Sequence, residues 1–178
     1  MKRTYVLKNS RNGQEMPDFK TVVEVELTET ELIFNFTCEN SQRFSAYEGY
    51  NTDIFDGDVC EAFICTDGSM HNYYELELAP NNSVFCTRVH NPENDFDKAT
   101  SEYEPINFVR SSVEFTENGY NAMFALPLDK IGYDKNKGIF FNIYRIETEG
   151  GECCKHLLAA NPTLCDSFHR FTSFFEFK

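Results

Sequence analysis

The sequence predicts an all-β protein: a single antiparallel β-sandwich of jelly-roll or immunoglobulin-like layering, extending over residues 1–178. Short segments rich in Val, Ile, Phe and Tyr recur along the chain, and Asn, Asp and Gly separate them. The 178 residues are 41% hydrophobic and include 18 Phe and 9 Tyr, which is enough for one sizeable core. No internal repeat, low-complexity tract or linker marks a second unit.

The first predicted elements form a hairpin. Its strands are Thr21 to Leu27 and Glu31 to Cys38, and Thr28 to Thr30 forms the turn between them. In the first strand, apolar residues alternate with Glu24 and Glu26. This alternation is typical of a strand that has one buried face and one solvated face.

The middle of the chain predicts a meander of three strands. It follows an irregular stretch with several aromatic residues, and residues that favour turns link its strands. The strands are Val59 to Thr66, Tyr73 to Ala79 and Ser83 to Val89. A loop with few aliphatic residues, Asn91 to Glu104, comes next.

The last part of the chain predicts further strands and brings the total to about nine or more. They are Val109 to Thr116, Tyr120 to Leu126, Ile139 to Ile146, a strand-like Leu157 to Ala160, and Phe174 to Phe177. Residues Leu128 to Gly132 predict one helical turn between the second and third of these strands.

Charge and hydropathy exclude several classes of partner. The chain holds 29 Asp and Glu against 16 Lys and Arg, and its formal charge of -13 would repel phosphate backbones and anionic lipid headgroups. We therefore expect neither nucleic acid nor membrane as a partner. No apolar run follows the basic residues after Met1, and no apolar stretch approaches bilayer length, which predicts a cytoplasmic protein, or a secreted one if a signal has been trimmed from the sequence.

The seven cysteines predict buried, reduced thiols rather than a disulfide framework. Their number is odd, and several lie inside predicted strands, including Cys38, Cys60 and Cys86. The sequence has no C-x-x-C, and the adjacent pair Cys153-Cys154 does not supply one. A structural zinc site is therefore not expected.

Strand alternation places a set of polar residues on the outward faces of their own strands, without showing that these faces form one surface. Odd positions in the strand from Val59 and in the strand from Tyr73 share one face of their strands. The residues assigned to outward faces are Glu61, Glu75, Glu77, Asn142 and Tyr144. The ordinary role of carboxylates in such places is to form a solvated sheet face. Arg145 falls on the inward face, where a buried ion pair is expected.

Several short motifs, in this order and spacing, resemble those of the family 9 carbohydrate-binding modules. The motifs are Phe55-Asp-Gly-Asp-Val-Cys-Glu61-Ala-Phe63, Tyr73-Tyr74-Glu75-Leu-Glu77, Phe141-Asn142-Ile-Tyr144-Arg145, Asn161-Pro162-Thr163 and Phe168-His169-Arg170 before Phe174. The resemblance covers the chain from roughly the first hairpin to the C-terminus. It implies a β-sandwich related to the cytochrome-type domains that share this architecture. It also implies a non-catalytic module of the kind attached to glycoside hydrolases such as xylanases, where it grips the end of a sugar chain.

The resemblance also implies where a sugar would bind. The two Trp side chains that sandwich the sugar in the family fall at Phe55 and Phe168, because this sequence has no Trp. Phe offers a smaller ring than indole, so we expect weaker stacking. The family's acidic ligand residue falls at Glu61, whose carboxylate can accept hydrogen bonds from two hydroxyl groups.

The remaining polar positions differ from those of the family. An Arg and an Asn of the family align with Glu75 and Glu77, and a Gln aligns with Tyr144; Asn142 completes the expected ligand-binding set. These changes leave an acidic floor. We therefore expect a neutral or basic sugar, a polyol or a cation-bridged saccharide rather than an anionic sugar.

The resemblance implies a structural calcium ion as well, although no cofactor is required for binding. Asp53, Asp56 and Asp58 supply oxygen ligands of the right hardness. Their spacing matches no known calcium loop.

Two enzymatic alternatives remain open at this point. Glu61 and Glu75 on neighbouring strands could act as acid and base in glycoside hydrolysis. Cys86 and His90 share one strand face and could form a nucleophile pair, but they point outward and no third group orients the base. The sequence favours a protein that is not an enzyme, because it shows few substrate-positioning groups.

Two non-enzymatic alternatives also remain. Related sandwiches bind haem through Met and His, and the only candidates here are Met70-His71 and Met123. The other alternative is a structural or interaction domain that has lost sugar binding and presents its acidic face to a basic partner.

Overall fold

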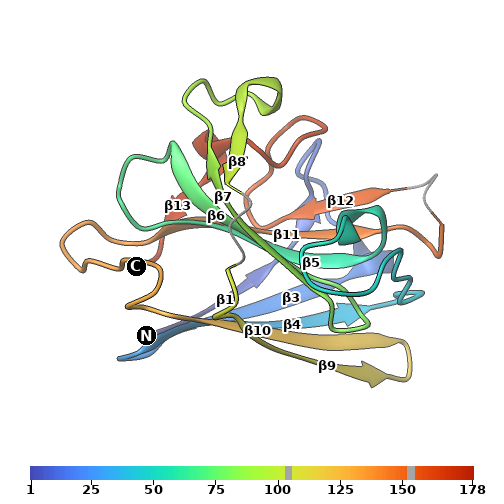
Figure 1. Ribbon diagram of the computed structural model, residues 1–178. Helices are drawn as coiled ribbons and strands as arrows, with labels where there is room; N and C mark the ends of the chain where they lie inside the picture. The colour runs from blue at the N-terminus through green and yellow to red at the C-terminus, as the bar shows by residue number, and fades with distance from the viewer. Residues whose placement is uncertain (103–105, 152–154) are drawn as a thin grey trace.

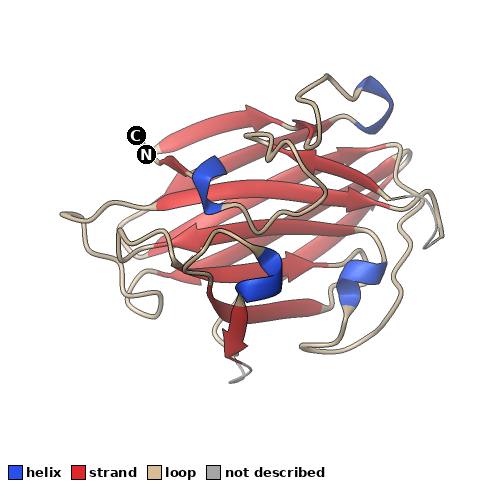
Figure 2. Cartoon of the chain, turned by 90° about the horizontal axis from the view of Figure 1, so that it is seen from above, coloured by secondary structure: helices blue, strands red, loops and turns tan. Residues whose placement is uncertain are grey.

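The computed structural model, which describes residues 1–102, 106–151 and 155–178, consists of two antiparallel β-sheets packed face to face (Figures 1 and 2). The predicted fold class is confirmed. Thirteen strands lie in these ranges, more than the sequence predicted. The end of the predicted loop Asn91 to Glu104 and the pair Cys153-Cys154 lie outside the described residues.

The first sheet has five strands, which form the lower layer of Figure 1. In spatial order they are β1 (Lys2–Val6), β3 (Thr21–Leu27), β4 (Glu31–Glu39), β10 (Gly119–Pro127) and β9 (Arg110–Thr116). The predicted first hairpin is confirmed as β3 and β4, with Leu27 opposite Leu32 at the turn and Thr21 opposite Cys38 at the open end.

The second sheet forms the upper layer of Figure 1. In spatial order its strands are β2 (Lys8–Asn9), β12 (His156–Ala159), β11 (Phe140–Glu147), β5 (Val59–Cys65), β6 (Asn72–Leu78), β7 (Val84–His90) and β8 (Thr100–Glu102), while β13 (Phe175–Glu176) pairs with β11. The predicted meander is confirmed as β5, β6 and β7. The strand β11 lies beside β5, so both are interior strands.

The strands that sequence reasoning missed, β1, β2 and β8, are short and polar. β1 has the sequence KRTYV, and most of its residues are exposed because only the partner strand β3 holds this edge strand in place. The predicted helical turn from Leu128 to Gly132 is a hydrogen-bonded turn instead, in which the amides of Lys130 and Ile131 donate to the carbonyl of Pro127.

Helical structure in the described residues is limited to single 3₁₀ turns. They are η1 (Pro17–Phe19), η2 (Ile54–Asp56), η3 (Phe96–Lys98) and η4 (Phe171–Ser173). None of the helices in the described ranges has the length and apolar character needed to span a bilayer.

The main core lies between the two sheets and is rich in aromatic rings. Phe34 and Phe124 of the first sheet are fully buried, with their ring centroids 5.1 Å apart. Phe141 of the second sheet meets Phe34 edge to face at 5.7 Å. Edge-to-face pairs of this kind are favourable beyond the area they bury, so they fix the distance and register between the two layers.

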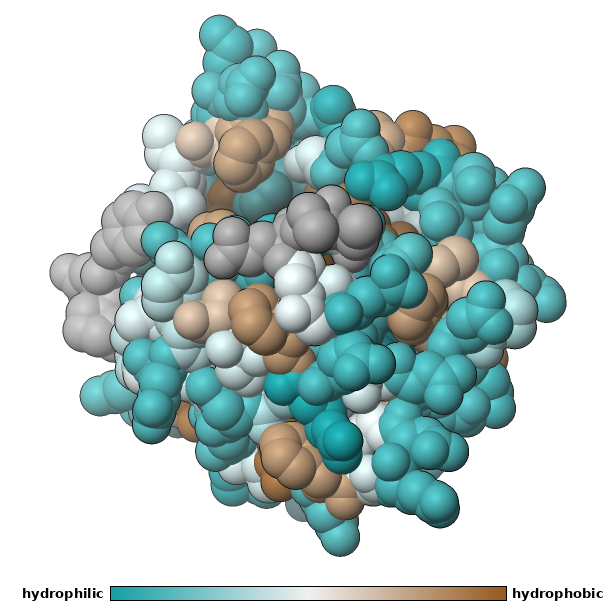
Figure 3. Space-filling model, turned by 90° about the vertical axis from the view of Figure 1, so that its right-hand side faces the viewer, coloured by the Kyte–Doolittle hydropathy of each residue, from teal (hydrophilic) through white to brown (hydrophobic). Residues whose placement is uncertain are grey.

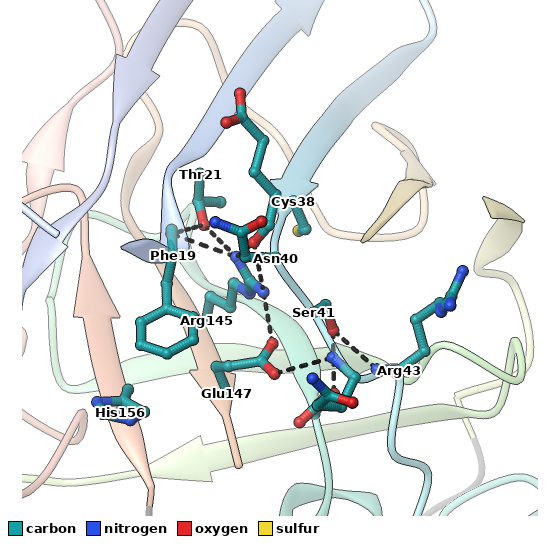
Figure 4. Close-up of polar contacts among 12 residues, drawn as sticks. Phe19, Thr21, Cys38, Asn40, Ser41, Arg43, Arg145, Glu147 and His156 are labelled. Atoms are coloured by element: carbon teal, nitrogen blue, oxygen red, sulfur yellow. Dashed lines mark hydrogen bonds and ion pairs between the residues drawn. The ribbon is translucent and has the colours of Figure 1, made fainter. Parts of the chain in front are cut away.

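A buried ion pair on β11 lies between the layers, and hydrogen bonds from its Arg145 cross to the first sheet (Figure 4). Arg145 on β11 points toward the first sheet, donates to the hydroxyl of Thr21 at 2.8 Å and to the carbonyls of Phe19 and Glu39, and pairs with Glu147. Both side chains of the pair are inaccessible to solvent. The inward ion pair expected from the sequence is therefore confirmed.

The described cysteines are free thiols, as the sequence predicted, and most are buried in the core. Cys38 on β4 and Cys60 on β5 face each other across the two sheets, with their sulfur atoms 3.5 Å apart. Cys86 also lies in this core rather than pointing outward, whereas His90 at the end of the same strand is exposed. The nucleophile pair considered above is therefore wrong.

A second apolar cluster lies on the opposite face of the second sheet. It includes Phe63, Tyr73, Phe85, Tyr144 and Phe168. Loops and single-turn helices cross this face in Figure 2 and bury much of it. The second sheet is therefore covered on both sides, and its outer face can hold an enclosed site.

Candidate functional site

A pocket of about 500 Å³ opens on the outer face of the second sheet. Its floor carries Glu61 from β5 and Glu75 and Glu77 from β6. Phe55 from η2 and Phe168 from the C-terminal loop contribute to its walls. The fold thus brings together residues that are more than a hundred positions apart in the sequence.

Strand register explains why the carboxyl groups share this surface. Glu61 lies opposite Glu77 on the neighbouring strand, and the row continues to Tyr144 on one side and Phe85 on the other. The next row places Phe63 opposite Glu75. Because side chains alternate between faces, all of these residues point away from the main core. The face assignment made from alternation is confirmed.

The carboxyl groups are nevertheless buried. Glu61 and Glu77 are each 2% exposed and Glu75 is 9% exposed, because the surrounding loops cover the outer face of the sheet. The expectation that these carboxylates form a solvated sheet face is therefore wrong. Within the described residues, Glu61 Oε1 and Glu77 Oε2 are buried without a hydrogen-bond partner. Unpaired polar atoms are unusual in folded proteins, and these two face a pocket.

Burial changes the protonation of this floor. It raises the pKa of Glu75 to about 8 and the pKa of both Glu61 and Glu77 well above their usual range. The neighbouring carboxyl groups raise the pKa of Glu61 and Glu77 further, while the charge of Lys155 lowers both. A protonated carboxyl can donate as well as accept a hydrogen bond. The floor can therefore pair with a ligand hydroxyl group that donates and with one that accepts.

His169 is a pocket residue that the sequence analysis named only as part of the Phe168-His169-Arg170 motif. Its Nδ1 lies 2.8 Å from the hydroxyl of Tyr73, and its Nε2 lies 3.5 Å from Oε1 of Glu75. Burial lowers the pKa of His169 to about 4, so the ring is neutral at neutral pH. Its place beside Phe168 was the only sequence signal for this role. Arg170 lies next to His169 and donates a hydrogen bond to the carbonyl of Asn94, which ties the C-terminal loop to the loop after β7.

The aromatic walls are not equally open. Phe168 is 7% exposed and stacks on Tyr144 with ring centroids 4.2 Å apart and an interplanar angle of 15°. Phe55 is 36% exposed and touches Phe85 edge to face. Phe55 is therefore the more accessible ring, and Phe168 is held in place from behind. Phe96, which is 58% exposed in a loop whose composition gave no functional signal, adds another aromatic wall.

Asn142 and Tyr144 lie beneath the site and do not line the pocket. The Asn142 amide donates to the carbonyl of Asn161 at 2.7 Å and to the hydroxyl of Ser173 at 2.9 Å. The Tyr144 hydroxyl donates to the carbonyl of Phe168 at 3.1 Å. Both side chains are fully buried and hold the C-terminal loop that carries Phe168. They therefore position the wall rather than face a ligand.

The three aspartates considered for calcium do not form an ion-binding shell. Asp58 is fully buried and accepts hydrogen bonds from the amides of Phe44 and Thr148 and the hydroxyls of Ser41 and Thr148. Asp56 lies 3.3 Å from the ammonium of Lys155. Among the described residues, no group of three or more acidic, His or Cys side chains is arranged to hold a metal ion. These aspartates do not fit the calcium ion that the resemblance implied.

Removal of divalent cations should therefore leave the fold unchanged. Because the chain itself already satisfies the carboxylate of Asp58, no bound ion is needed to stabilise the loop that contains it. We expect the melting temperatures in EDTA and in millimolar calcium to agree within the error of differential scanning fluorimetry. A rise of several degrees in calcium would show that these aspartates bind the ion.

The structure does not support the haem alternative, because the candidate ligands lie apart. Met123 lies on β10 of the first sheet, whereas Met70 and His71 precede β6 of the second sheet. The ring of His71 packs against Phe171 with centroids 4.9 Å apart. The fold therefore does not bring the candidate ligands to one site.

Apolar side chains do not mark a broad docking surface on the side shown in Figure 3. Among the described residues visible there, hydrophobic groups form small, separate patches on a mostly hydrophilic surface. Patches of this size are ordinary on soluble proteins.

Comparison with known proteins identifies the fold. No family model and no curated protein matches the sequence. A protein of Bacteroides uniformis ATCC 8492, provisionally named carbohydrate-binding, superposes with a TM-score of 0.72 and 12% identity over 97% of this chain and 84% of its own. A family 9 carbohydrate-binding module of Caldicellulosiruptor kristjanssonii in complex with glucose gives a TM-score of 0.63 and 12% identity over 98% of this chain and 83% of its own.

A family 9 module from the same organism in complex with cellotriose gives a TM-score of 0.59 and 11% identity over 89% of this chain and 72% of its own. The resemblance seen in the sequence motifs is therefore confirmed at the level of the fold, which is that of the family 9 carbohydrate-binding modules.

Proposed function

We propose that the protein is a non-catalytic carbohydrate-binding module that holds a monosaccharide or the end of an oligosaccharide in the pocket on its second sheet. One observation carries the proposal. The pocket combines an accessible aromatic ring, Phe55, with buried carboxyl oxygens on Glu61 and Glu77 that have no hydrogen-bond partner among the described residues.

The dimensions and chemistry of the pocket suit a sugar. Its volume of about 500 Å³ lies within the range of small-ligand sites. A pyranose has one apolar face, which can stack on Phe55, and a rim of hydroxyl groups, which can pair with Glu61 and Glu77. The similarity of fold to modules solved with glucose and cellotriose supports this proposal.

The same electrostatics argue against glycoside hydrolysis. That reaction needs one protonated carboxyl and one ionised carboxylate, whose pKa values are pushed apart by different surroundings. Here burial raises the pKa of Glu61, Glu75 and Glu77 alike. The surroundings therefore shift all three pKa values in the same direction rather than apart, and binding without cleavage is the function that fits this floor.

We further propose that neutral and basic sugars bind in preference to uronic acids. An anionic ligand would meet the acidic groups Glu61, Glu75 and Glu77 and would suppress the ionisation of each. Lys155 is the Lys or Arg of the described residues whose charge acts on Glu61 and Glu77, and its ammonium is already held by Asp56 and the carbonyl of Phe55.

Substitution of Phe55 tests the proposed binding mode. We expect Phe55→Ala to weaken the binding of glucose or cellotriose by about ten-fold, because stacking on an aromatic ring contributes about 0.5–1.5 kcal/mol beyond the area it buries. Isothermal titration calorimetry measures the change.

Phe115→Ala is the matched control, because Phe115 is an exposed Phe on β9 of the other sheet. It should bind as the unmodified protein does. Equal affinities for Phe55→Ala and Phe115→Ala would contradict the proposed stacking. The absence of binding to any neutral sugar would favour the interaction-domain alternative.

A further inference from the structure

The floor of the pocket contains two buried carboxyl groups on adjacent strands that have no ion-pair partner among the described residues. Glu61 and Glu77 lie directly opposite each other on β5 and β6, an arrangement that is unfavourable for two ionised side chains. Each is 2% exposed. Within the described residues, neither forms an ion pair, because the ammonium of Lys155 lies on Asp56 and on the carbonyl of Phe55.

This arrangement destabilises the protein and points to a ligand. A buried polar atom without a partner costs about 1–3 kcal/mol, and more where it is charged. Glu61 Oε1 and Glu77 Oε2 are two such atoms on adjacent strands, and both residues line the same pocket. A ligand group that pairs with both oxygens would remove this penalty.

The chemistry of the floor selects among possible ligand groups. An anion is disfavoured, because it finds no basic partner at Glu61 or Glu77 and would oppose the ionisation of both. A metal ion does not fit, because no group of three or more suitable side chains is arranged to hold one in the described part of the chain. A single hydroxyl group has only one hydrogen to donate. A primary ammonium group has three hydrogens and a positive charge, so it can pair with Glu61 Oε1 and Glu77 Oε2 together.

We propose that the preferred ligand of this pocket is an amino sugar, whose protonated amine pairs with Glu61 and Glu77 while its ring lies against Phe55. The inference rests on the proposed function, because it assigns a sugar class to the same site.

Binding of an ammonium group should release protons from the floor. In the empty pocket, burial favours the neutral carboxyl forms, whereas a bound cation favours the ionised forms. The titratable and charged groups that line or face this floor are Glu61, Glu75, Glu77, Asp53, Asp56, Lys155, Asp166, His169 and Tyr73. Affinity for an amino sugar should therefore rise from pH 5 toward pH 8 and fall once the amine loses its own proton. Affinity for glucose should lack this rise.

A comparison of three related sugars tests the inference. Calorimetry with glucosamine, N-acetylglucosamine and glucose separates the charge of the amine from the presence of a nitrogen substituent. At pH 7.5 we expect glucosamine to bind at least ten-fold more tightly than either neutral sugar. Titration in two buffers of different ionisation enthalpy should also show proton release with glucosamine only.

Variants link the preference to the two carboxyl groups. In Glu61→Gln and in Glu77→Gln, the ratio of the glucosamine affinity to the glucose affinity should fall toward one. Glu114→Gln, which changes an exposed carboxyl on β9 of the other sheet, should keep the ratio. Circular dichroism establishes that each variant is folded, and folding is expected because Gln has nearly the same shape as Glu.

The possible outcomes separate the inference from the proposed function. If glucose binds and glucosamine binds no more tightly, the amino-sugar inference is overturned and the proposed function stands. If no sugar binds, both fail. If methylamine binds as tightly as glucosamine, the pocket is an amine site, and its assignment to a sugar is overturned.

Discussion

Arg145→Met is expected to destabilise the protein by about 3–5 kcal/mol, because removal of one member of a buried ion pair leaves the other charge uncompensated. Arg145 and Glu147 are both inaccessible to solvent, and the guanidinium also donates to Thr21 and to the carbonyls of Phe19 and Glu39. The substitution therefore removes hydrogen bonds that join β11 to the first sheet. Urea denaturation followed by circular dichroism gives the free energy of unfolding.

The protein offers a matched control for this substitution. Arg110 pairs with Glu31 at 3.0 Å on the surface, and its side chain is 55% exposed. Exposed pairs contribute at most about 1 kcal/mol, so Arg110→Met should change the stability only slightly. The double variant Arg145→Met/Glu147→Leu should recover part of the loss, because it removes the uncompensated carboxylate. Equal losses in Arg145→Met and Arg110→Met would show that the buried pair is not required.

The sandwich could be predicted because its central strands carry their burial pattern in the sequence. The alternation in β3, β5 and β6 separates core-facing from outward-facing residues, and the observed registers agree with it. The edge strands β1 and β8 could not be predicted in this way. Their residues are mostly exposed, and these strands are ordered by pairing with a neighbour rather than by an apolar face of their own.

The site could be predicted only in part, for a related reason. Alternation placed Glu61 and Glu77 on the outward faces of their own strands, but it could not show that the two faces form one surface or that distant loops bury it. The loop that contains Phe168 follows no periodic pattern and is held by hydrogen bonds to Asn142. Phe96 was missed for the same reason, because the position of a loop residue depends on tertiary contacts.

The carboxyl groups of the pocket should make the protein less stable as the pH rises. Each carboxyl whose pKa is raised by folding binds its proton more tightly in the folded state than in the unfolded state. The stability that it contributes is fully present below the unfolded pKa of about 4.3 and is lost as the pH rises through the folded pKa. For Glu75 the folded pKa is about 8, and for Glu61 and Glu77 it is also raised. The loss therefore falls between about pH 4.5 and pH 8 for Glu75.

Glu77→Gln should abolish part of this loss. Gln stays neutral at every pH, so at pH 8.5 the variant should be more stable than the unmodified protein by about 1–3 kcal/mol, and at pH 4.5 the two should be nearly equal. Chemical denaturation at both pH values measures the difference. The difference between the two unfolding free energies cancels the effect of the overall charge of -13, because both proteins share this charge apart from the one group. Glu114→Gln, at an exposed position, should show no such dependence. A variant less stable than the unmodified protein at pH 8.5 would contradict the prediction.

Glu77→Gln should raise the stability at high pH but lower the preference for glucosamine over glucose. These opposite effects distinguish a ligand-binding group from a structural one. A carboxyl retained for the fold would lower stability when replaced, as a lost hydrogen bond does. Glu77 instead has an oxygen without a partner in the described structure and lies opposite another carboxyl. Its replacement should raise stability at high pH and lower the preference for an amine-bearing ligand. Such an exchange of stability for binding is expected where a site holds unpaired groups ready for a ligand.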